Sequence, residues 1–351
     1  MTIPTIRRTD LAGPGVLTEI GKGGEGTVFD IAGRPGVVYK EYLPRTGLVL
    51  NRAALERLIA RTADFTDHER QRIISRTAWP TDLVVDGARI TGYVMPRIPE
   101  TYWRTHGASH DPRRVPCDLN YLTYRAQWQT SKDLVSDVPR LDVPDILRLL
   151  ADLSETMALL HRYGLVMGDV SGRNLLWTDR PALSVFVIDC DAFRPEGEEA
   201  VNPPKESPDW GDPAVKNGRT DRASDVYKLG LAAYRSLGAR ASRFPPMSPE
   251  PIEGVPDAVI DLIWRSIALD GRPSAAEWAT TTRQLLQFGN RPVVAVNAPR
   301  PSPPTDPPAA PATHPNGASA PASASVRDAP PPPSPSGPSG RPVIPINSSR
   351  P

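Results

Sequence analysis

Short strand patterns fill the first hundred residues of this chain, whereas long helical patterns dominate after Pro144. Between residues 15 and 41, apolar and polar residues alternate in segments separated by glycine-containing turns, which predicts an antiparallel β-meander. A hairpin with an Asp-Gly turn is predicted over 83–95, and a helix over about 51–63. Further helices are predicted over 145–164, 224–238 (with Ser224 as N-cap), 255–267 and 273–288. The pattern indicates an α+β chain with a ligand cleft between a β-rich and an α-helical lobe.

Proline is concentrated at the end of the chain. Of its 42 prolines, 18 lie between residues 299 and 351, where large apolar side chains are few. Such a segment cannot bury enough surface to offset its ordering entropy, so we expect a disordered tail with polyproline II character. The tail is a potential ligand for a partner that recognises proline. Folded structure is therefore expected over roughly residues 10–290.

Charge and cysteine content exclude several classes of protein. The chain has 41 Lys and Arg against 40 Asp and Glu, which gives no basic surface for nucleic acid or an anionic membrane. Its two cysteines make no disulfide framework. No apolar signal region follows the N-terminal arginines, and no apolar run approaches the ~18 residues of a membrane helix. We therefore expect a cytoplasmic protein.

A glycine loop of the pattern G-x-G-x-x-G-x-V, with glycines at Gly21, Gly23 and Gly26, lies between the first two predicted strands. Glycines let backbone N–H groups approach phosphate oxygens. A dinucleotide fingerprint would open a helix, whereas this loop joins two strands, as the kinase loop over ATP does. Lys40 ends an apolar strand 14 residues beyond Gly26, where its charge can reach phosphates. A glycine-rich hairpin without a ligand is the alternative at this point.

Two carboxylates and an amide follow the helix predicted over 145–164. Asp169 and Asn174 form a D-x-x-x-x-N pattern, and Asp189 ends an apolar strand 15 residues further on. Phosphoryl transfer requires a carboxylate that orients the attacking hydroxyl and accepts its proton, and oxygen ligands that hold Mg²⁺. Each acid alone could be a cap or turn residue, but the ordered series of glycine loop, lysine, D-x4-N and strand aspartate indicates a kinase site.

With these motifs in this order, residues 14–288 resemble the eukaryotic-like (Hanks-type) protein kinases of bacteria. Residues 224–230, SDVYKLG, are similar to the S-D-V-W-S-L-G of the kinase F helix, in which Asp225 would brace the catalytic loop. Residues 272–274, RPS, are similar to the R-P-S/T that opens the last kinase helix. The resemblance implies a bilobal kinase fold with an N-lobe over 14–98 and a C-lobe over 99–290, which carries an insert at about 99–140, before the proline-rich tail 299–351.

The resemblance also implies roles for individual residues. Asp169 would be the catalytic base, and Arg173 would supply positive charge to the transferred phosphoryl group. ATP would be bound by Gly21, Gly23, Gly26, Val28, Lys40, Glu56, Met95 and Ile98. Among these, Met95 would be the gatekeeper, Ile98 would lie in the hinge, and Glu56 would be the helix glutamate that grips Lys40, with Glu69 as the alternative. Asn174 and Asp189 would ligate Mg²⁺.

The sequence departs from the kinase pattern at positions that serve control. Gly168 replaces the arginine that precedes the catalytic aspartate in most kinases, so the chain would be of the non-RD type. Ser207 is the one hydroxyl side chain between the metal aspartate and Pro213, and residues 210–214 offer no glutamate for Arg272. We therefore expect an activity that does not depend on phosphorylation of the activation loop.

The predicted function is transfer of the γ-phosphate of ATP, with Mg²⁺, to serine or threonine hydroxyls of protein substrates. The alternatives are a nucleotide-binding pseudokinase that acts as a scaffold, and a small-molecule kinase on the same fold. Residues 21–29 and 78–98 further resemble a subgroup of bacterial kinases encoded beside phosphatase and von Willebrand A-type proteins. That resemblance implies substrates among the products of neighbouring genes.

Overall fold

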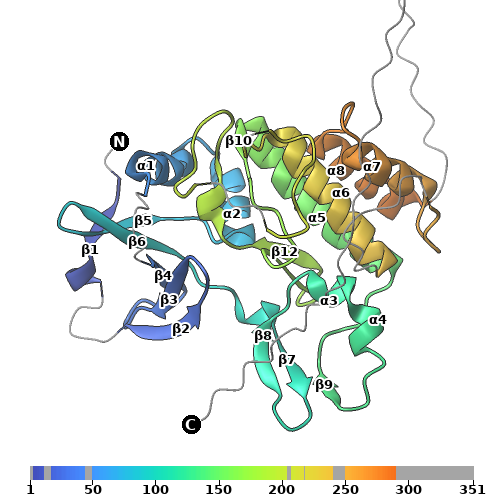
Figure 1. The fold of residues 1–351 in the computed structure, drawn as a ribbon, viewed down its shortest axis with the longest axis horizontal. Coiled ribbons are helices and arrows are strands. Elements are labelled where there is room, and N and C mark those ends of the chain that lie inside the picture. The colour runs from blue at the N-terminus through green and yellow to red at the C-terminus, as the bar shows by residue number, and fades with distance from the viewer. Residues whose placement is uncertain are drawn as a thin grey trace, which may run out of the picture. The chain divides into compact units, whose positions relative to one another are not determined.

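The computed structural model describes residues 3–11, 17–43, 50–203, 207–216, 218–239 and 250–289. These residues belong to one structural unit, Met1–Val293. The predicted proline-rich tail, 299–351, lies outside the described residues. Within the unit, Figure 1 shows a sheet of the first strands beside a group of long helices, with a second, smaller sheet below the helices.

A six-stranded sheet forms the first part of the unit. In pairing order its strands are β1 (Thr5–Arg7), β5 (Asp82–Asp86), β6 (Arg89–Pro96), β4 (Val37–Tyr42), β3 (Gly26–Asp30) and β2 (Thr18–Lys22). Strands β2, β3 and β4 form an antiparallel meander, and β5 and β6 form a hairpin whose two-residue turn contains Gly87, so both sequence predictions are confirmed. Strand β4 pairs with β6, which joins the meander to the hairpin, and β1 pairs in parallel with β5.

Two helices follow the meander, α1 (Arg52–Ala60) and α2 (Asp67–Arg76). The side chain of Asn51 caps α1 by accepting a hydrogen bond from the backbone N–H of Ala54. The apolar residues that predicted this helix, Leu55, Leu58 and Ile59, are buried in the main hydrophobic core. Helix α2, which the sequence analysis did not predict, begins with a capping box between a threonine and a glutamate three residues later.

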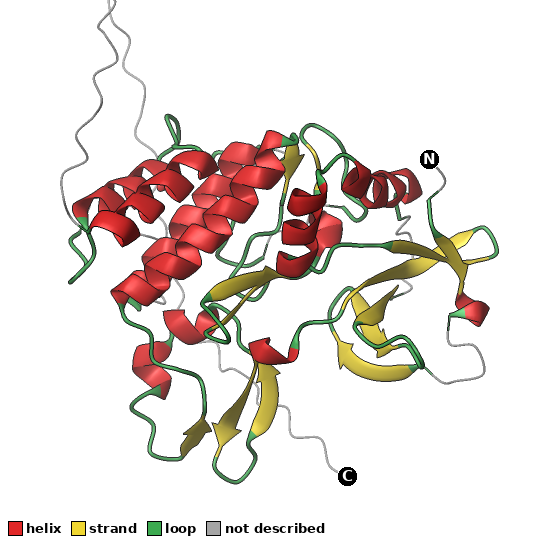
Figure 2. Cartoon of the chain, turned by 180° about the vertical axis from the view of Figure 1, so that it is seen from behind, coloured by secondary structure: helices red, strands yellow, loops and turns green. Residues whose placement is uncertain are grey.

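The predicted insert at about 99–140 is a small sheet with two short helices. It comprises β7 (Trp103–Ala108), β8 (Arg113–Pro116), β9 (Leu134–Ser136), α3 (Asn120–Thr123) and α4 (Arg125–Trp128), with β7 between β8 and β9. Figures 1 and 2 both show this sheet beside α3 and α4 and away from the six-stranded sheet. Arg104 on β7 is 1% exposed and donates to a carboxylate oxygen of Asp179 (2.5 Å), which ties the insert to the rest of the unit.

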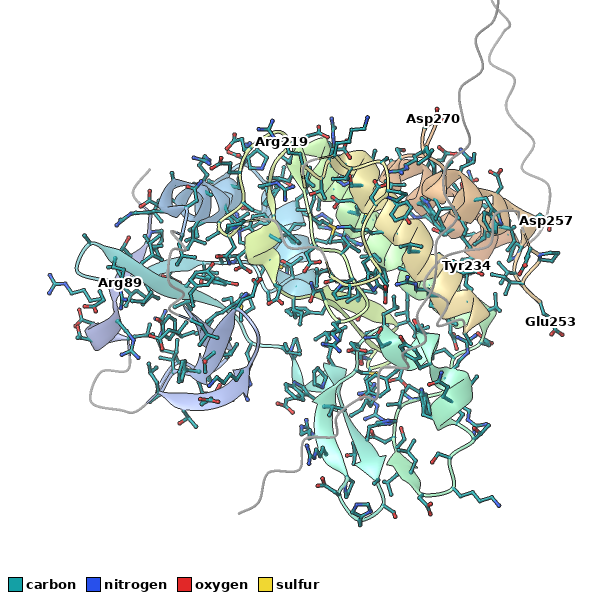
Figure 3. The ribbon with its side chains drawn as sticks, in the orientation of Figure 1. Arg89, Arg219, Tyr234, Glu253, Asp257 and Asp270 are labelled. Atoms are coloured by element: carbon teal, nitrogen blue, oxygen red, sulfur yellow. The ribbon has the colours of Figure 1, made fainter. Side chains whose placement is uncertain are left out.

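The second part of the unit is built from helices α5 (Val143–Arg162), α6 (Arg222–Gly238), α7 (Asp257–Ile267) and α8 (Ala275–Phe288). Helix α5 packs against α8, and α6 packs against α7. On that second contact, Tyr234 (labelled in Figure 3) and Trp264 meet edge to face, with 6.2 Å between ring centroids. The four helix predictions are confirmed, but the proposed cap of α6 was wrong. Asp221 is the N-cap, and it accepts from the backbone N–H of Ser224, which lies one turn inside the helix.

Short strand pairs connect α5 to α6 and position the candidate site. Strands β11 (Leu175–Thr178) and β12 (Ser184–Val187) pair antiparallel, and β10 (Leu165–Val166) pairs with β13 (Arg194–Pro195). The unit thus has the bilobal α+β fold expected of a kinase-like chain, with a β-rich part followed by an α-helical part. No helix in the described ranges is long and apolar enough to cross a bilayer.

Candidate active site

The loop between β10 and β11 presents Asp169 and Asn174 together. The side-chain amide of Asn174 donates to the backbone oxygen and to a carboxylate oxygen of Asp169, both at 2.9 Å. The other carboxylate oxygen of Asp169 accepts from the hydroxyl of Ser207, also at 2.9 Å. The amide therefore fixes the orientation of the carboxylate, and a hydroxyl group lies where an acceptor hydroxyl would approach a general base.

Helix α6 holds this loop through Asp225, which is fully buried. Its carboxylate accepts from the backbone N–H groups of Met167 (2.7 Å) and Gly168 (2.9 Å). Lys228, one turn further along the helix, donates to the backbone oxygen of Gly168 (2.6 Å). These charge-assisted bonds fix the backbone just before Asp169, as the resemblance implied for Asp225.

Lys40 lies in a buried cluster of polar groups. Its ammonium donates to Asp191 (2.9 Å) and to Asp189 (3.1 Å). The hydroxyls of Tyr42 and Tyr93 donate to the two oxygens of Asp191, each at 3.0 Å. The side chains of Lys40 and Asp191 are 5% and 4% exposed, whereas that of Asp189 is 49% exposed. Asp189 thus connects the buried cluster to the open side of the site.

Electrostatics keep the Lys40–Asp191 pair ionised despite its burial. Burial opposes the charged form of Lys40, but the carboxylates of Asp191 and Asp189 outweigh it and raise the pKa of the ammonium above its usual range. Burial likewise opposes ionisation of Asp191, but Lys40 and the two tyrosine hydroxyls hold the pKa of its carboxyl below the usual value. Burial raises the pKa of both tyrosines, which therefore remain donors at neutral pH.

The prediction that Glu56 grips Lys40 is wrong in this structure, and so is the alternative, Glu69. Glu56 pairs with Arg52 one turn earlier on α1, on the exposed side of the helix (2.7 Å). Glu69 belongs to the capping box of α2 and accepts from the hydroxyl of Tyr163 (2.6 Å). Within the described residues, the ion pairs of Lys40 are those with Asp189 and Asp191. Asp191, two residues beyond the predicted metal aspartate, takes the place expected for a helix glutamate.

The glycine loop is the turn between β2 and β3, closed by a hydrogen bond from Gly23 N to Gly26 O (2.8 Å). A Cβ at Gly26 would lie 2.5 Å from the carbonyl oxygen of Glu41, so the packing of β3 against β4 requires glycine there. A Cβ at Gly21 would meet nothing within 4 Å, and one at Gly23 only the oxygen of Gly26 at 3.8 Å. Neither glycine has a positive φ. The described structure gives no internal reason for glycine at 21 and 23, whereas close approach of phosphate oxygens would.

A cavity of about 320 Å³ brings these predicted elements together. Gly24 of the glycine loop lines it, along with Asp169, Asn174 and Asp189. The half-exposed carboxylate and the carboxamide supply the oxygen donors that Mg²⁺ prefers when it also binds phosphates. Arg173 lines the same cavity and is exposed, so its guanidinium is accessible to a phosphoryl group. The residues present therefore fit Mg²⁺ together with phosphate groups, whereas Lys40 and the residues predicted to contact adenine do not line this cavity.

The residues predicted to contact adenine lie where β3 and β6 meet the core. Met95 on β6 is 8% exposed and belongs to the main hydrophobic core, and Val28 on β3 and Ile98 beyond β6 pack against it. Arg97, next to Ile98, donates its backbone N–H to the oxygen of Gly36 (2.9 Å). These contacts fix the connection between the two parts of the unit, and the adenine contacts themselves stay a prediction.

The side chain of Arg194 occupies the space beside Gly168. Arg194 belongs to the activation segment, the stretch between Asp189 and Pro213. A Cβ at Gly168 would lie 2.5 Å from Nη1 of Arg194, and Gly168 has a φ of +79°, so a side chain is strained there in any case. Arg194 is 6% exposed and donates to the backbone oxygens of Ala192 (3.1 Å) and Thr220 (3.0 Å). Its guanidinium therefore ties the residues just after Asp189 to those just before α6.

Arg272 has a partner that the sequence analysis did not recognise. Asp212 accepts from both terminal nitrogens of Arg272, at 2.5 and 2.8 Å, and the two side chains are 1% and 5% exposed. Residues 210–214 contain no glutamate, as the sequence analysis states, but Asp212 serves in its place. The shorter aspartate makes the bidentate pair and fixes the end of the activation segment to the start of α8.

Comparison with known proteins agrees with this geometry. No protein-family model matches the chain. It is 26% identical over 182 residues to protein kinase YegI of Escherichia coli K12, an alignment that covers 50% of this chain and 23% of YegI. It is 27% identical over 161 residues to Tribbles homolog 3 of Bos taurus, which covers 43% of this chain and 44% of that protein. The chain thus spans less than half the length of these relatives, and the similarity supports a protein-kinase-like family.

Proposed function

We propose that the chain is an ATP- and Mg²⁺-dependent protein kinase that phosphorylates serine or threonine. The observation that carries the proposal is the 320 Å³ cavity, because it joins the glycine loop to Asp169, Asn174 and Asp189. The order of these elements along the chain and the similarity to protein kinase YegI support it. In this proposal residues 14–98 and 99–290 act as the two kinase lobes.

Each charged group has a role in transfer. Asp169 orients the acceptor hydroxyl and accepts its proton as the oxygen forms a bond to the γ-phosphorus and the bond to the ADP oxygen breaks. Lys40, kept cationic by Asp191, holds the α- and β-phosphates. Asn174 and Asp189 would hold Mg²⁺, which offsets charge on the phosphates. Arg173 stabilises the charge of the transferred group.

We further propose that this activity does not depend on phosphorylation of the activation loop. Without any phosphate, Arg194 ties the residues after Asp189 to those before α6, and Asp212 pairs with Arg272. Ser207 donates to Asp169, so a phosphate on Ser207 would place negative charge against the catalytic carboxylate. A cytoplasmic location, partners encoded by neighbouring genes and docking through the tail stay predictions from the sequence.

Transfer of label from γ-labelled Mg-ATP to casein, and separately ATP binding, test the proposal. We expect Asp169→Asn to reduce transfer by at least about a hundredfold and to leave ATP affinity within about twofold, because the base acts mainly in the transition state. Asp270→Asn, an exposed aspartate between α7 and α8 (Figure 3), is the control and should leave both unchanged. Treatment with phosphatase beforehand should leave the wild-type rate unchanged.

Three results would count against the proposal. ATP binding by the wild-type chain without any transfer would favour the pseudokinase. Transfer to small molecules but to no protein would favour the small-molecule kinase. Transfer at the wild-type rate by Asp169→Asn would contradict the assignment of the base.

A further inference from the structure

A second cavity, of about 660 Å³, is lined in part by the catalytic loop. It is lined by Asp118, Tyr121 and Trp128 from the 99–140 segment and by Ser171 from the catalytic loop. Backbone contacts join these two segments, since the N–H of Leu119 donates to the oxygen of Gly172 (3.0 Å). The insert therefore builds one wall of a cavity whose other wall belongs to the active site.

This cavity adjoins the place of the acceptor hydroxyl. Ser207 and Arg173 line both this cavity and the 320 Å³ cavity described above. The hydroxyl of Ser207 is bound to Asp169, and Ser171 follows Asp169 by two residues. A side chain close to the acceptor in a bound protein would therefore reach the second cavity.

Two polar groups in the cavity lack strong partners. The carboxylate of Asp118 accepts from the backbone N–H of Asn120 (2.9 Å) and from its side-chain amide (3.4 Å). The charge of Arg173 also acts on it, but no described residue forms an ion pair with it. Burial raises the pKa of this carboxyl to about 6. The hydroxyl of Ser171, in a side chain that is 2% exposed, has no hydrogen-bond partner among the described residues. Buried polar groups are normally paired, so the hydroxyl of Ser171 points to a ligand that donates hydrogen bonds, and the half-buried carboxylate of Asp118 can accept further ones from the same ligand.

The remaining walls favour a cation with a flat, apolar body. Tyr121 and Trp128 present aromatic rings, and His106 packs edge to face against both, at 4.7 and 5.7 Å between centroids. Burial lowers the pKa of His106, so this residue adds no positive charge at neutral pH. Aromatic faces beside a carboxylate bind guanidinium groups well, because the rings attract the cation and the fork of donors matches the carboxylate.

Two arginines line the cavity, and each also contacts groups other than Asp118 or lines another cavity. Arg235 lies over the ring of Trp210 (4.5 Å to the centroid) and donates to the backbone oxygen of Asp209 (2.6 Å). Arg173 also lines the 320 Å³ cavity, and its charge opposes the rise that burial causes in the pKa of Asp118 but does not cancel it. The cavity thus combines a carboxylate that forms no ion pair with a described residue, an unpaired hydroxyl and aromatic rings.

We propose that this cavity binds an arginine side chain of the protein substrate, close in sequence to the phosphorylated residue. Asp118 pairs with the guanidinium, Ser171 accepts a further hydrogen bond, and Tyr121 and Trp128 cover its apolar faces. The inference rests on the proposed kinase function, because it assigns a substrate class to that site. It gives the 99–140 segment a role in specificity.

The test uses binding as well as transfer. The probes are fluorescein-labelled peptides with one central serine. Each peptide carries a single arginine, placed at one of the three positions before or the three positions after the serine. A matched peptide carries citrulline, a neutral isostere of arginine, at the same position. We expect the unmodified chain to bind arginine at one position at least about tenfold more tightly than citrulline. Asp118→Asn should abolish that difference. Asp111→Asn, an exposed acid paired with Arg113 in the same segment, is the matched control and should retain the preference.

The outcomes separate this inference from the proposed function. An arginine preference that needs Asp118, without phosphate transfer to any peptide or protein, supports the arginine site and overturns the kinase proposal. If the chain transfers phosphate but binds the arginine and citrulline peptides equally, or binds neither, at every position, the arginine site is overturned. The kinase proposal then still stands. An arginine preference that survives Asp118→Asn also overturns the site.

Discussion

At the scale of single residues, the placement of Asp191 decides how Lys40 is held. A glutamate on a mobile helix would tie the lysine to the position of that helix. Here the partner lies two residues from Asp189 and is fixed by Tyr42 and Tyr93, from strands β4 and β6. The lysine and its acid are thus ordered by the sheet and by the segment after β12, without a contribution from α1 or α2.

Replacing Asp191 by asparagine tests this arrangement. Removal of one partner leaves Lys40 buried with only the half-exposed Asp189, and broken buried pairs cost about 3–5 kcal/mol. We expect Asp191→Asn to lower the free energy of unfolding by about that amount and to weaken ATP binding and transfer together. Glu56→Gln and Glu69→Gln should leave transfer within about twofold. Inactivity of Glu56→Gln, or full activity of Asp191→Asn, would show that a helix glutamate holds the lysine after all.

The sequence predicted which residues lie together best where a motif specifies both the residue types and their spacing along the chain. Lys40, Asp169, Asn174 and Asp189 follow motifs with fixed distances along the chain, and the structure brings them to one place. Glu56 was chosen for its helix alone, and no local pattern reveals whether a helix turns a given acid toward solvent or toward a lysine. Asp191 carried a signal, since it closely follows an apolar strand, but its tyrosine partners come from distant strands.

At the scale of elements, the glycines of the β2–β3 loop serve two different purposes, packing between strands and access for phosphate. Gly26 is required because β3 packs against the backbone of β4, whereas a Cβ at Gly21 would meet nothing within 4 Å and one at Gly23 only the oxygen of Gly26 at 3.8 Å. Hairpins such as β2–β3 and β5–β6 could be predicted because alternation and turn residues are local features. The 99–140 segment could not, since β8 and β9 are short and β9 pairs with β7 across the two intervening helices.

Alanine substitutions in the loop test this division. Gly21→Ala and Gly23→Ala should change the free energy of unfolding by no more than about 1 kcal/mol, because the added Cβ meets little. They should raise the KM for ATP, because the Cβ would crowd the phosphates. Gly26→Ala should lower the unfolding free energy by about 1–3 kcal/mol through overpacking against Glu41. An unchanged KM for ATP in both Gly21→Ala and Gly23→Ala would leave the loop without a role in nucleotide binding.

At the scale of the whole molecule, the cavity beside the catalytic loop affects stability as well as recognition. A carboxylate that is buried without a cation lowers the stability of the folded chain at any pH where it is ionised. Asp118 is partly such a group, because burial raises the pKa of its carboxyl to about 6 although hydrogen bonds from Asn120 and the charge of Arg173 oppose that rise. A site that is prepared for an arginine should therefore be less stable when it is empty.

The pH dependence of unfolding tests this cost. Because the folded-state pKa of Asp118 is raised from 3.8 to about 6, the folded chain binds the proton more tightly than the unfolded chain, and this group lowers stability as pH rises from about 4 to 6. A rise of that size corresponds to at most about 3 kcal/mol. We expect Asp118→Asn to unfold at a higher temperature than the wild type at pH 8 and at the same temperature at pH 4. The arginine peptide should raise the wild-type midpoint at pH 8 and leave that of Asp118→Asn unchanged. Equal midpoints for the two chains at pH 8 would mean that Asp118 already has a compensating partner.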